Sequence, residues 1–401
     1  MDCTQVATAA KKRDSIHSCL GRPPSKEVLG TFPEYVRQAI LNIRANHPGW
    51  GAKVIHAELS ANPKFEGLVL PSIRSIGVLL KAKGLVRAYE KHVAIPNTEL
   101  CSAQQPHEVW QLDAQGGVKL PNIGPIAMIN IKDVVSRVYC MAYPNKKKSI
   151  HGYSLRLDYQ CALRLAFSEH GLPQRIQTDH EGVFVESKGK SPFPSVFHLW
   201  LVGLGVALSF SRIKRPTDQG LVERMHQTIE KQVLQGIMYP NWEKLFDFCQ
   251  QRRGFLNQHF RCASLDDRSP YQAFPEAKHS GRPYYLQKEE QLIDLNRIYQ
   301  FLGKGKWYRK VSTLRSLTLG GQVYYVANAK PNTQLYITFD VESKLLHFHN
   351  DKEILIQKIP IKGINKERLM GEIFWKMINV QLQLPLYWNT QKISTTFLHN
   401  T

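Results

Sequence analysis

The chain has 401 residues, 43% of them hydrophobic, with 53 lysines and arginines against 33 aspartates and glutamates, a net charge of +20. This hydrophobic content excludes a disordered chain. No apolar stretch reaches the roughly 18 residues of a membrane helix, so no membrane protein is expected. No apolar block follows the basic residues near the N-terminus, so no secretory signal is expected. Seven scattered cysteines without a CxxC pair argue against a disulfide framework or zinc ribbon and favour a reducing, cytoplasmic setting.

The positive charge is spread along the chain, because residues 1–106, 107–284 and 285–401 are each net basic. A polyanion that contacts every part of the protein, such as double-stranded DNA, is the natural partner of such a chain. The alternative is a generically basic protein whose charge serves solubility.

Residues 1–25 are polar and predict a tail and linker, and residues 26–98 predict three short helices. Ser72 can cap the third helix, and Gly84 ends it. Apolar residues recur at helical spacing: Val36, Ile40 and Ile43 in the first helix, Val54, Ile55 and Leu59 in the second, and Ile73, Ile76, Leu79 and Leu80 in the third, from which Arg74, Lys81 and Lys83 point outward. This pattern suits a helix-turn-helix or winged-helix DNA-binding unit, although an ordinary helical bundle with a charged face would also fit.

Residues 99–282 predict a different architecture, in which strands alternate with helices. The expected order is three strands, helix, strand, helix, strand, helix, which is a three-layer α/β domain with a mixed sheet. The expected segments are Val109–Asp113, Ile126–Ile131, Val138–Tyr143, a helix from about Leu155 to Ala166, Arg175–Asp179, Phe197–Leu204, Val206–Ser211 and Leu221–Val233.

After Pro283 strands dominate the pattern. They are expected at Trp307–Val311, Gln322–Ala327, Gln334–Asp340 and Leu345–His349, with turns at Gly320-Gly321 and Lys330-Pro331-Asn332. The interpretation is a small β-barrel over residues 283–365, followed by a tail, residues 366–401, in which no pattern is placed.

Three carboxylates stand where a shared site can form. Asp113 and Asp179 each end a predicted strand, and ligands of open α/β sheets bind outside strand ends. Glu223 lies in the first turn of the last helix, beside the stripe that Val222, Met225, Ile229 and Val233 form, so it can lean toward those strand ends. Converging carboxylates are hard ligands that favour Mg²⁺ or Mn²⁺, and phosphodiester cleavage uses two such ions about 4 Å apart. We expect Asp113 to bridge two ions, with Asp179 and Glu223 each completing one; strand-end or helix-start charges without a metal are the alternative.

The segments WQLDAQG, RIQTDHEGVF and RPTDQGLVERMHQT resemble the three catalytic blocks of the DDE transposase and retroviral-type integrase superfamily. HPGWGAKVIHAEL with LPSIRSIGVLLKAKGLV resembles the helix-turn-helix segment of bacterial insertion-sequence transposases, and GKWYRKVSTLRSLTLGGQVYYV resembles their small C-terminal barrel. The resemblance covers about residues 30 to 365. It implies an RNase H-like mixed-sheet core between a helix-turn-helix unit and an SH3-like barrel.

The sequence departs from the family pattern in three places. The stretch from Asp179 to Glu223 is longer than usual, with its surplus near residues 186–194. His180-Glu181-Gly182 stands where Asn-Gly is usual, which offers Glu181 as a rival ligand. The lysines of the retroviral Glu helix are replaced by Gln227 and Glu230, so contact with DNA is expected from Arg224, His226 and Lys231.

Other residues were weighed for a role. Arg309 and Lys310 interleave with aromatic residues and are candidates for contact with the DNA backbone. Asp133 is interpreted as a turn residue and His347 and His349 as solvated strand residues rather than metal ligands. No GxxxxGK[ST] loop is present, so no nucleotide cofactor is expected.

The resulting hypothesis is a metal-dependent transposase or integrase that cuts and joins DNA strands to move a mobile element. It would act as at least a homodimer on element ends and target DNA, in the bacterial cytoplasm, associated with the nucleoid. Two alternatives stay open: a transposase-derived DNA-binding protein without turnover, and a metal-dependent nuclease that does not join strands.

Overall fold

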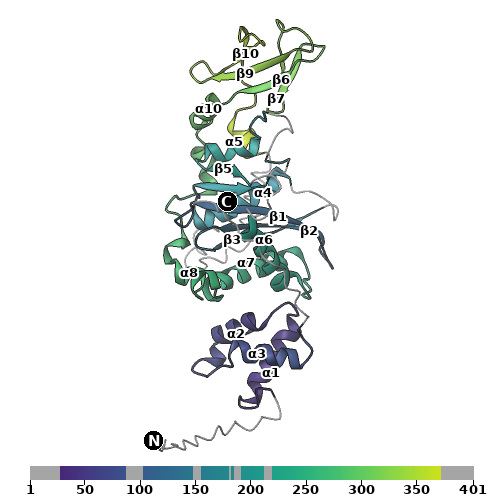
Figure 1. Cartoon of the computed structure of the whole chain (residues 1–401), viewed down its shortest axis with the longest axis vertical. Helices are drawn as coiled ribbons and strands as arrows, with labels where there is room; N and C mark the ends of the chain where they lie inside the picture. The colour runs from purple at the N-terminus through teal and green to yellow at the C-terminus, as the bar shows by residue number, and fades with distance from the viewer. Residues whose placement is uncertain are drawn as a thin grey trace, which may run out of the picture. The chain divides into compact units, whose positions relative to one another are not determined.

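A computed structural model of the chain describes residues 28–86, 103–147, 155–179, 182–184, 191–211 and 219–371. The chain separates into two compact units near residue 90. Helices α1 to α3 form the first unit, and the second contains every strand and the remaining helices of the described residues (Figure 1). None of the described helices is long and apolar enough to cross a membrane.

The first unit is a small bundle of α1 (Glu34–Asn46), α2 (Ala52–Ala61) and α3 (Ile73–Ala82), with a 3-10 turn at Pro63–Phe65. Its core is apolar, and Ser72 caps α3 by accepting a hydrogen bond from the Ser75 amide at 3.1 Å. Ile73, expected inside, is instead 41% exposed, because α3 turns only Ile76, Leu79 and Leu80 inward. The segment between α2 and α3 is longer than the three- or four-residue turn of a helix-turn-helix, and residues 28–86 contain no strand that could form a wing. The DNA-binding assignment of this unit stays a prediction.

The second unit is built on a mixed five-stranded sheet of order β3-β2-β1-β4-β5. The first three strands are antiparallel neighbours, whereas β4 runs parallel to both β1 and β5. The strands are β1 (Val109–Leu120), β2 (Gly124–Asp133), β3 (Tyr139–Lys146), β4 (Arg175–Thr178) and β5 (Ala207–Phe210). This is the predicted mixed α/β sheet, in the predicted strand order along the chain.

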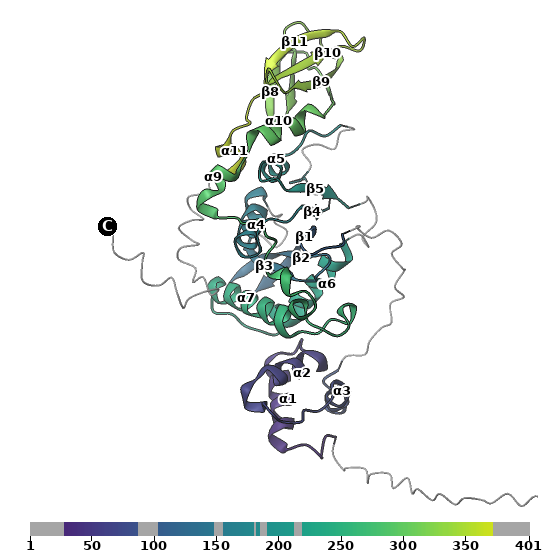
Figure 2. The same cartoon turned by 90° about the vertical axis from the view of Figure 1, so that its left-hand side faces the viewer.

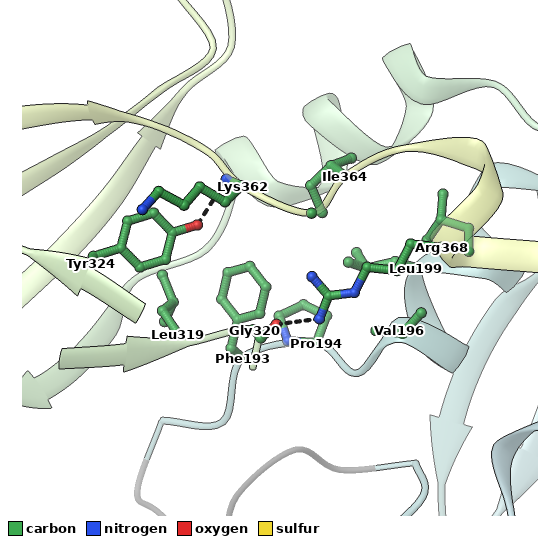
Figure 3. A pocket seen from close by; sticks show the side chains of 12 residues that line it. Phe193, Pro194, Val196, Leu199, Leu319, Gly320, Tyr324, Lys362, Ile364 and Arg368 are labelled. Carbon is green, nitrogen blue, oxygen red and sulfur yellow. Dashed lines mark hydrogen bonds between the residues drawn. The ribbon is translucent and has the colours of Figure 1, made fainter. Parts of the chain in front are cut away.

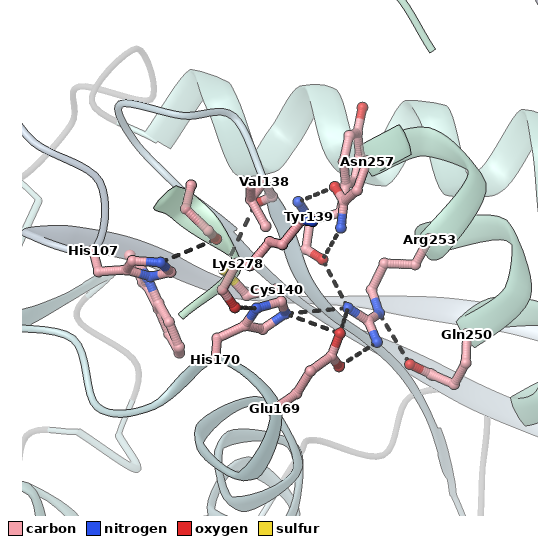
Figure 4. A network of polar contacts seen from close by, with 12 residues as sticks. His107, Val138, Tyr139, Cys140, Glu169, His170, Gln250, Arg253, Asn257 and Lys278 are labelled. Carbon is pink, nitrogen blue, oxygen red and sulfur yellow. Dashed lines mark hydrogen bonds and ion pairs between the residues drawn. The ribbon is translucent and has the colours of Figure 1, made fainter. Parts of the chain in front are cut away.

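Helices cover both faces of this sheet (Figure 2). Because successive strand residues point to opposite faces, Trp110 and Leu112 pack with the α4 and α5 side, while Met128 packs with α6 and α7. The helices are α4 (Arg156–His170), α5 (Val196–Gly203), α6 (Gly220–Ile229), its continuation as a π-helical turn (Glu230–Leu234) and α7 (Trp242–His259). Helix α7 was not predicted. Its Arg253 lies in a buried network with Glu169, His170 and the Tyr139 carbonyl, which ties α7 to α4 and β3 (Figure 4).

Strand β1 corrects one expectation, because it does not end at Asp113 but continues to Leu120. Its pairing with β2 is interrupted between Gln115 and Val118, where Gly116 and Gly117 form an irregularity, and then resumes. Glycines inside a strand often mark such bulges. The pairing of β1 with β4, in contrast, has its last pair at Gln111 and Gln177, so Asp113 lies just past the end of the parallel part of the sheet.

The chain crosses several short helices before the last strands begin: α8 (Pro270–Ala273), α9 (Glu289–Leu292) and α10 (Leu295–Gly303), with 3-10 turns at Ala263–Leu265, Pro275–Lys278 and Leu286–Lys288. Buried Glu289 holds this segment to the core. Its carboxylate accepts hydrogen bonds from Arg164 Nε at 2.6 Å and Nη2 at 2.7 Å and from Trp200 Nε1 at 2.8 Å. Helices therefore fill the start of a region that was predicted to be mostly strands.

The C-terminal strands form a four-stranded antiparallel sheet of order β11-β10-β9-β6 and a separate hairpin of β7 and β8. They are β6 (Trp307–Lys310), β7 (Ser316–Leu319), β8 (Gln322–Tyr325), β9 (Gln334–Asp340), β10 (Leu345–His349) and β11 (Leu355–Pro360), followed by α11 (Lys366–Met370). Among the described residues the two sheets are not hydrogen-bonded into one closed barrel, so the SH3-like barrel stays a prediction. Where the hairpin meets the core, Arg368 Nη2 donates to the Gly320 carbonyl at 2.9 Å beside a small hollow lined by Phe193 (Figure 3).

Candidate active site

Asp113 lies on the face of β1 that α6 covers. Its neighbours Trp110 and Leu112 belong to the opposite core, so alternation along the strand turns Asp113 toward α6. Its side chain is 28% exposed. One carboxylate oxygen, Oδ1, accepts a hydrogen bond from the Ala114 amide at 2.9 Å, and Oδ2 lies 3.0 Å from His226 Nε2. Asp113 is thus a half-buried carboxylate with a fixed orientation.

Asp179 directly follows β4 and stands next to Asp113 by register. Gln111 of β1 pairs with Gln177 of β4, and each aspartate comes two residues later on its chain. Two residues along a strand return to the same face, and neighbouring strands are about 4.8 Å apart. The two aspartates therefore follow adjacent parallel strands at the same level of the sheet.

Glu223 reaches the same place from the first turn of α6. Although much of its side chain faces solvent, partial burial raises the pKa of its carboxyl and the negative charge of Asp113 raises this pKa further, while His226 acts in the opposite direction. Glu223 also lies one helical turn before His226, which contacts Asp113. Asp113 and Glu223 thus form a pair of like charges that a cation would stabilise.

His226 corrects a second expectation, since it is not placed to contact DNA. It lies on the buried face of α6, 8% exposed, between Asp113 and Asn130. A carboxylate can only accept, so His226 Nε2 carries the proton and donates to Asp113 Oδ2, while Nδ1 accepts from Asn130 Nδ2 at 2.7 Å. The sequence contained a signal for this, because position 226 is four residues after buried Val222 and thus on the same face.

The residues around this pair fit a hard divalent cation. Two buried oxygens on this face of the sheet have no hydrogen-bond partner among the described residues: Gln115 Oε1, two residues beyond Asp113, and Asn130 Oδ1, whose residue pairs with Asp113 across β1 and β2. Such atoms are costly unless water or a ligand satisfies them. In the described part of the chain no three acidic, histidine or cysteine side chains are gathered tightly enough to enclose a metal. Mg²⁺ does not need such a cage, because it usually binds one or two carboxylates and completes its shell with waters and substrate phosphate oxygens.

Most of the other candidate DNA contacts are exposed cations. Arg74, Lys81 and Lys83 are exposed on or just after α3, as are Arg224 and Lys231 along α6 and its π-helical turn and Lys310 on β6. Arg309 differs from these. Its guanidinium donates to the carbonyls of Ser191 at 2.8 Å and Thr318 at 3.2 Å, so this side chain holds local structure together instead of facing a partner.

The residues set aside as metal ligands have structural partners. Buried Asp133 accepts hydrogen bonds from the amides of His107 at 2.8 Å and Ser136 at 2.6 Å, as a turn aspartate does. His349 stacks on Tyr336 with ring centroids 4.4 Å apart. Glu181, the rival ligand, and His180 lie outside the described residues.

Two residues of the site were missed. Gln111 belongs to the segment WQLDAQG but received no role, and Asn130 was taken only as part of a strand. Gln111 hydrogen-bonds with both Gln177 and the Val222 amide, and Asn130 holds His226. A polar residue at a strand position that faces a helix is the signal that would have found both.

No family model matches the sequence. In structure the chain is similar to the HTLV-2 integrase catalytic core domain in complex with magnesium, at 20% identity over 42% of this chain and 96% of that chain, with a TM-score of 0.32. It is also similar to the BIV integrase catalytic core, at 13% identity over 43% of this chain and 95% of that chain, TM-score 0.30. The third neighbour is a simian T-cell lymphotropic virus intasome in complex with PP2A regulatory subunit B56 gamma, at 13% identity over 77% of this chain and 99% of that chain, TM-score 0.34.

By their descriptions these structural neighbours are retroviral integrases. Similarity to bacterial insertion-sequence transposases remains a prediction. Because overlaps at TM-scores near 0.3 do not establish a shared activity, we base function on the geometry of the site itself.

Proposed function

We propose that this protein is a polynucleotidyl transferase of the DDE type, which cuts DNA at the ends of a mobile element and joins these ends to target DNA. The observation that supports the proposal is that Asp113 and Asp179 follow paired positions of adjacent parallel strands and that α6, which carries Glu223 in its first turn, contacts Asp113 through His226. Carboxylates held on two strands and one helix are suited to bind Mg²⁺, with Mn²⁺ as a substitute, and two ions per site. When bound, such ions supply Lewis acidity that stabilises charge on the phosphodiester oxygens.

The proposed reaction has two steps with the same balance of bonds. In the first, a water oxygen forms a bond to phosphorus as the bond to the 3′ oxygen breaks, which leaves a 3′-hydroxyl and a 5′-phosphate. In the second, that 3′-hydroxyl oxygen attacks a phosphodiester of the target, and the target's own 3′ oxygen leaves with a proton. Neither step needs a covalent bond to the protein. Asp113 would touch both ions, and Asp179 and Glu223 would each complete one.

Other residues of the chain would prepare this site. The hydrogen bond from His226 fixes Oδ2 of Asp113, and Asn130 fixes the ring of His226. DNA would be held by the exposed cations on α3, on α6 and at Lys310, and the net charge of +20 supports a long polyanionic partner. Two element ends require two sites, so the active form would be at least a dimer.

Two other functions compete with this proposal. A DNA-binding protein descended from such enzymes would keep the fold without turnover, but the presence of all three carboxylates, Asp113, Asp179 and Glu223, speaks against it. A nuclease that cuts without joining could use the same carboxylates. Basic charge outside the catalytic part of the chain is better explained if two DNAs are held together.

The test is incubation of labelled element-end DNA with a target plasmid, with nicked and joined products scored separately. Wild-type protein is expected to give both products only with Mg²⁺ or Mn²⁺, and Asp113→Ala, Asp179→Ala and Glu223→Ala are each expected to lose both. Nicking without joining, with cognate ends supplied, would favour the nuclease. No product from wild type, with tight DNA binding retained, would favour the inactive DNA-binding protein.

A further inference from the structure

Gln111 links the three elements that carry the candidate carboxylates. It lies on β1, is 3% exposed, and points to the same face of the strand as Asp113. Its Oε1 accepts a hydrogen bond from the backbone amide of Val222 on α6 at 3.2 Å, and its Nε2 donates to Oε1 of Gln177 on β4 at 3.2 Å. One side-chain amide therefore joins β1, β4 and α6.

The bond to Val222 replaces a missing helix cap. The first amides of an α-helix have no partner within the helix, and a side chain at the N-cap usually accepts from the third helical residue. The N-cap of α6 is Gln219, whose side chain makes no such bond, and Val222 is the third residue of the helix. Gln111 supplies the cap from the neighbouring strand, so the first turn of α6 is fixed to β1.

Each of the three carboxylates lies within two residues of Gln111 or of one of its two hydrogen-bond partners. Asp113 is two residues beyond Gln111, Asp179 is two residues beyond Gln177, and Glu223 directly follows Val222. Over such short stretches of strand and helix a shift of the hydrogen-bonded partner is passed on to the carboxylate almost unchanged. This buried side chain therefore helps to set the relative positions of the three acids, together with the backbone pairing of β1 and β4 and the packing of α6.

We propose that Gln111 is a positioning residue that sets the spacing of Asp113, Asp179 and Glu223 for a divalent cation. The inference rests on the proposed function and deepens it, since Gln111 touches neither DNA nor the reacting atoms. The role needs a group that accepts from Val222 and also bonds to Gln177. Glutamate at this position could do both, because the Gln177 amide can rotate and donate to it, whereas methionine can do neither and asparagine is one methylene too short.

The experiment compares Gln111→Met and Gln111→Glu with Gln160→Met. Gln160 is a matched control, since it is a fully buried glutamine on α4 whose Nε2 donates to the Leu369 carbonyl at 2.9 Å, outside the site. Three quantities are measured on the full chain: hydrogen exchange of the amides in residues 219–226, Mn²⁺ affinity by electron paramagnetic resonance, and the rate of metal-dependent strand cutting. If Gln111→Met does not fold, Gln111→Asn takes its place with the same expected defects.

Gln111→Met is expected to speed exchange at the start of α6 and to weaken Mn²⁺ binding and cutting by about 10- to 100-fold each, as loss of a group that orients metal ligands does. Gln111→Glu keeps an acceptor for Val222 but adds a negative charge beside the three carboxylates, so it should restore slow exchange at the start of α6, and Gln160→Met should change none of the three quantities. A Gln111→Met protein that matches Gln160→Met in exchange and Mn²⁺ affinity overturns the proposal, and so does a Gln111→Glu protein whose α6 amides exchange as fast as those of Gln111→Met. Wild type that binds Mn²⁺ but never cuts DNA would refute the proposed function, and the Mn²⁺ comparison would still decide the role of Gln111.

Discussion

Replacement of His226 by alanine distinguishes two roles of this residue. The sequence predicted a contact with DNA, whereas the structure shows a hydrogen-bond partner of Asp113. The substitution removes the bond to Asp113 Oδ2 at 3.0 Å and leaves the Asn130 amide, 2.7 Å from Nδ1, without its acceptor. A hydrogen bond to a charged group contributes about 1.5–3 kcal/mol and a stranded buried amide costs about 1–3 kcal/mol. Because Asp113 is 28% exposed and water can replace part of its bond, we expect a loss of roughly 2–3 kcal/mol in the free energy of unfolding.

The assay pairs urea unfolding with DNA anisotropy at several salt concentrations, and Arg224→Ala on the same helix is the contrasting variant. His226→Ala should lose stability and strand cutting but keep the salt dependence of DNA binding, since a buried ring neutralises no phosphate. Arg224 is exposed, and its loss should lower the log–log salt slope by about 0.9 if it contacts one phosphate. A His226→Ala protein of unchanged stability whose salt slope falls by about 0.9 would refute the structural role and restore the DNA contact.

Three further predictions concern stability, pH and binding. Glu289→Ala should lower the free energy of unfolding by about 3–5 kcal/mol, because the guanidinium of Arg164, 1% exposed, loses its carboxylate. In urea unfolding the control Lys244→Ala, at an exposed position, should change this free energy little, and an equally small effect of both substitutions would contradict the reasoning. Burial lowers the pKa of His170 from 6.5 to about 4, so His170 takes up a proton in the unfolded chain before it does so in the folded protein. The stability present above pH 6.5 should therefore be lost as the pH falls toward 4, by at most about 3 kcal/mol. His170→Gln should reduce this dependence of the unfolding free energy on pH, and an unchanged dependence would exclude His170 as its source. Asp113→Asn should keep tight, salt-sensitive duplex binding in anisotropy, and a salt slope near zero would be incompatible with DNA held by the basic surface.

The sequence was sufficient for the order of the core elements because each leaves a periodic pattern. The stripe of Val222, Met225, Ile229 and Val233 along α6 and its π-helical turn is fully buried, as its helical spacing predicted. In each case one face of an element packs on the core, and the spacing of apolar residues in the sequence identifies that face.

Features that depend on contacts between distant segments could not be predicted. Nothing in the local sequence says that Gln111 caps α6 or that Asn130 holds His226, because these partners are about 100 residues apart and meet only after folding. The strand was expected to end at Asp113, and only the partner strand β2 shows that pairing continues to Leu120. Arg309 looked like a free cation until the carbonyls that accept from it were known.

The most direct test of the central claim is to locate Mn²⁺ by anomalous X-ray diffraction from crystals of the protein with Mn²⁺ and element-end DNA. The account predicts two anomalous peaks about 4 Å apart, both within ligand distance of Asp113, with Asp179 next to one and Glu223 next to the other. Mn²⁺ bound away from these residues, or Asp113 and Glu223 carboxylates more than about 10 Å apart in that complex, would contradict it, since one pair of ions could not then be shared between them.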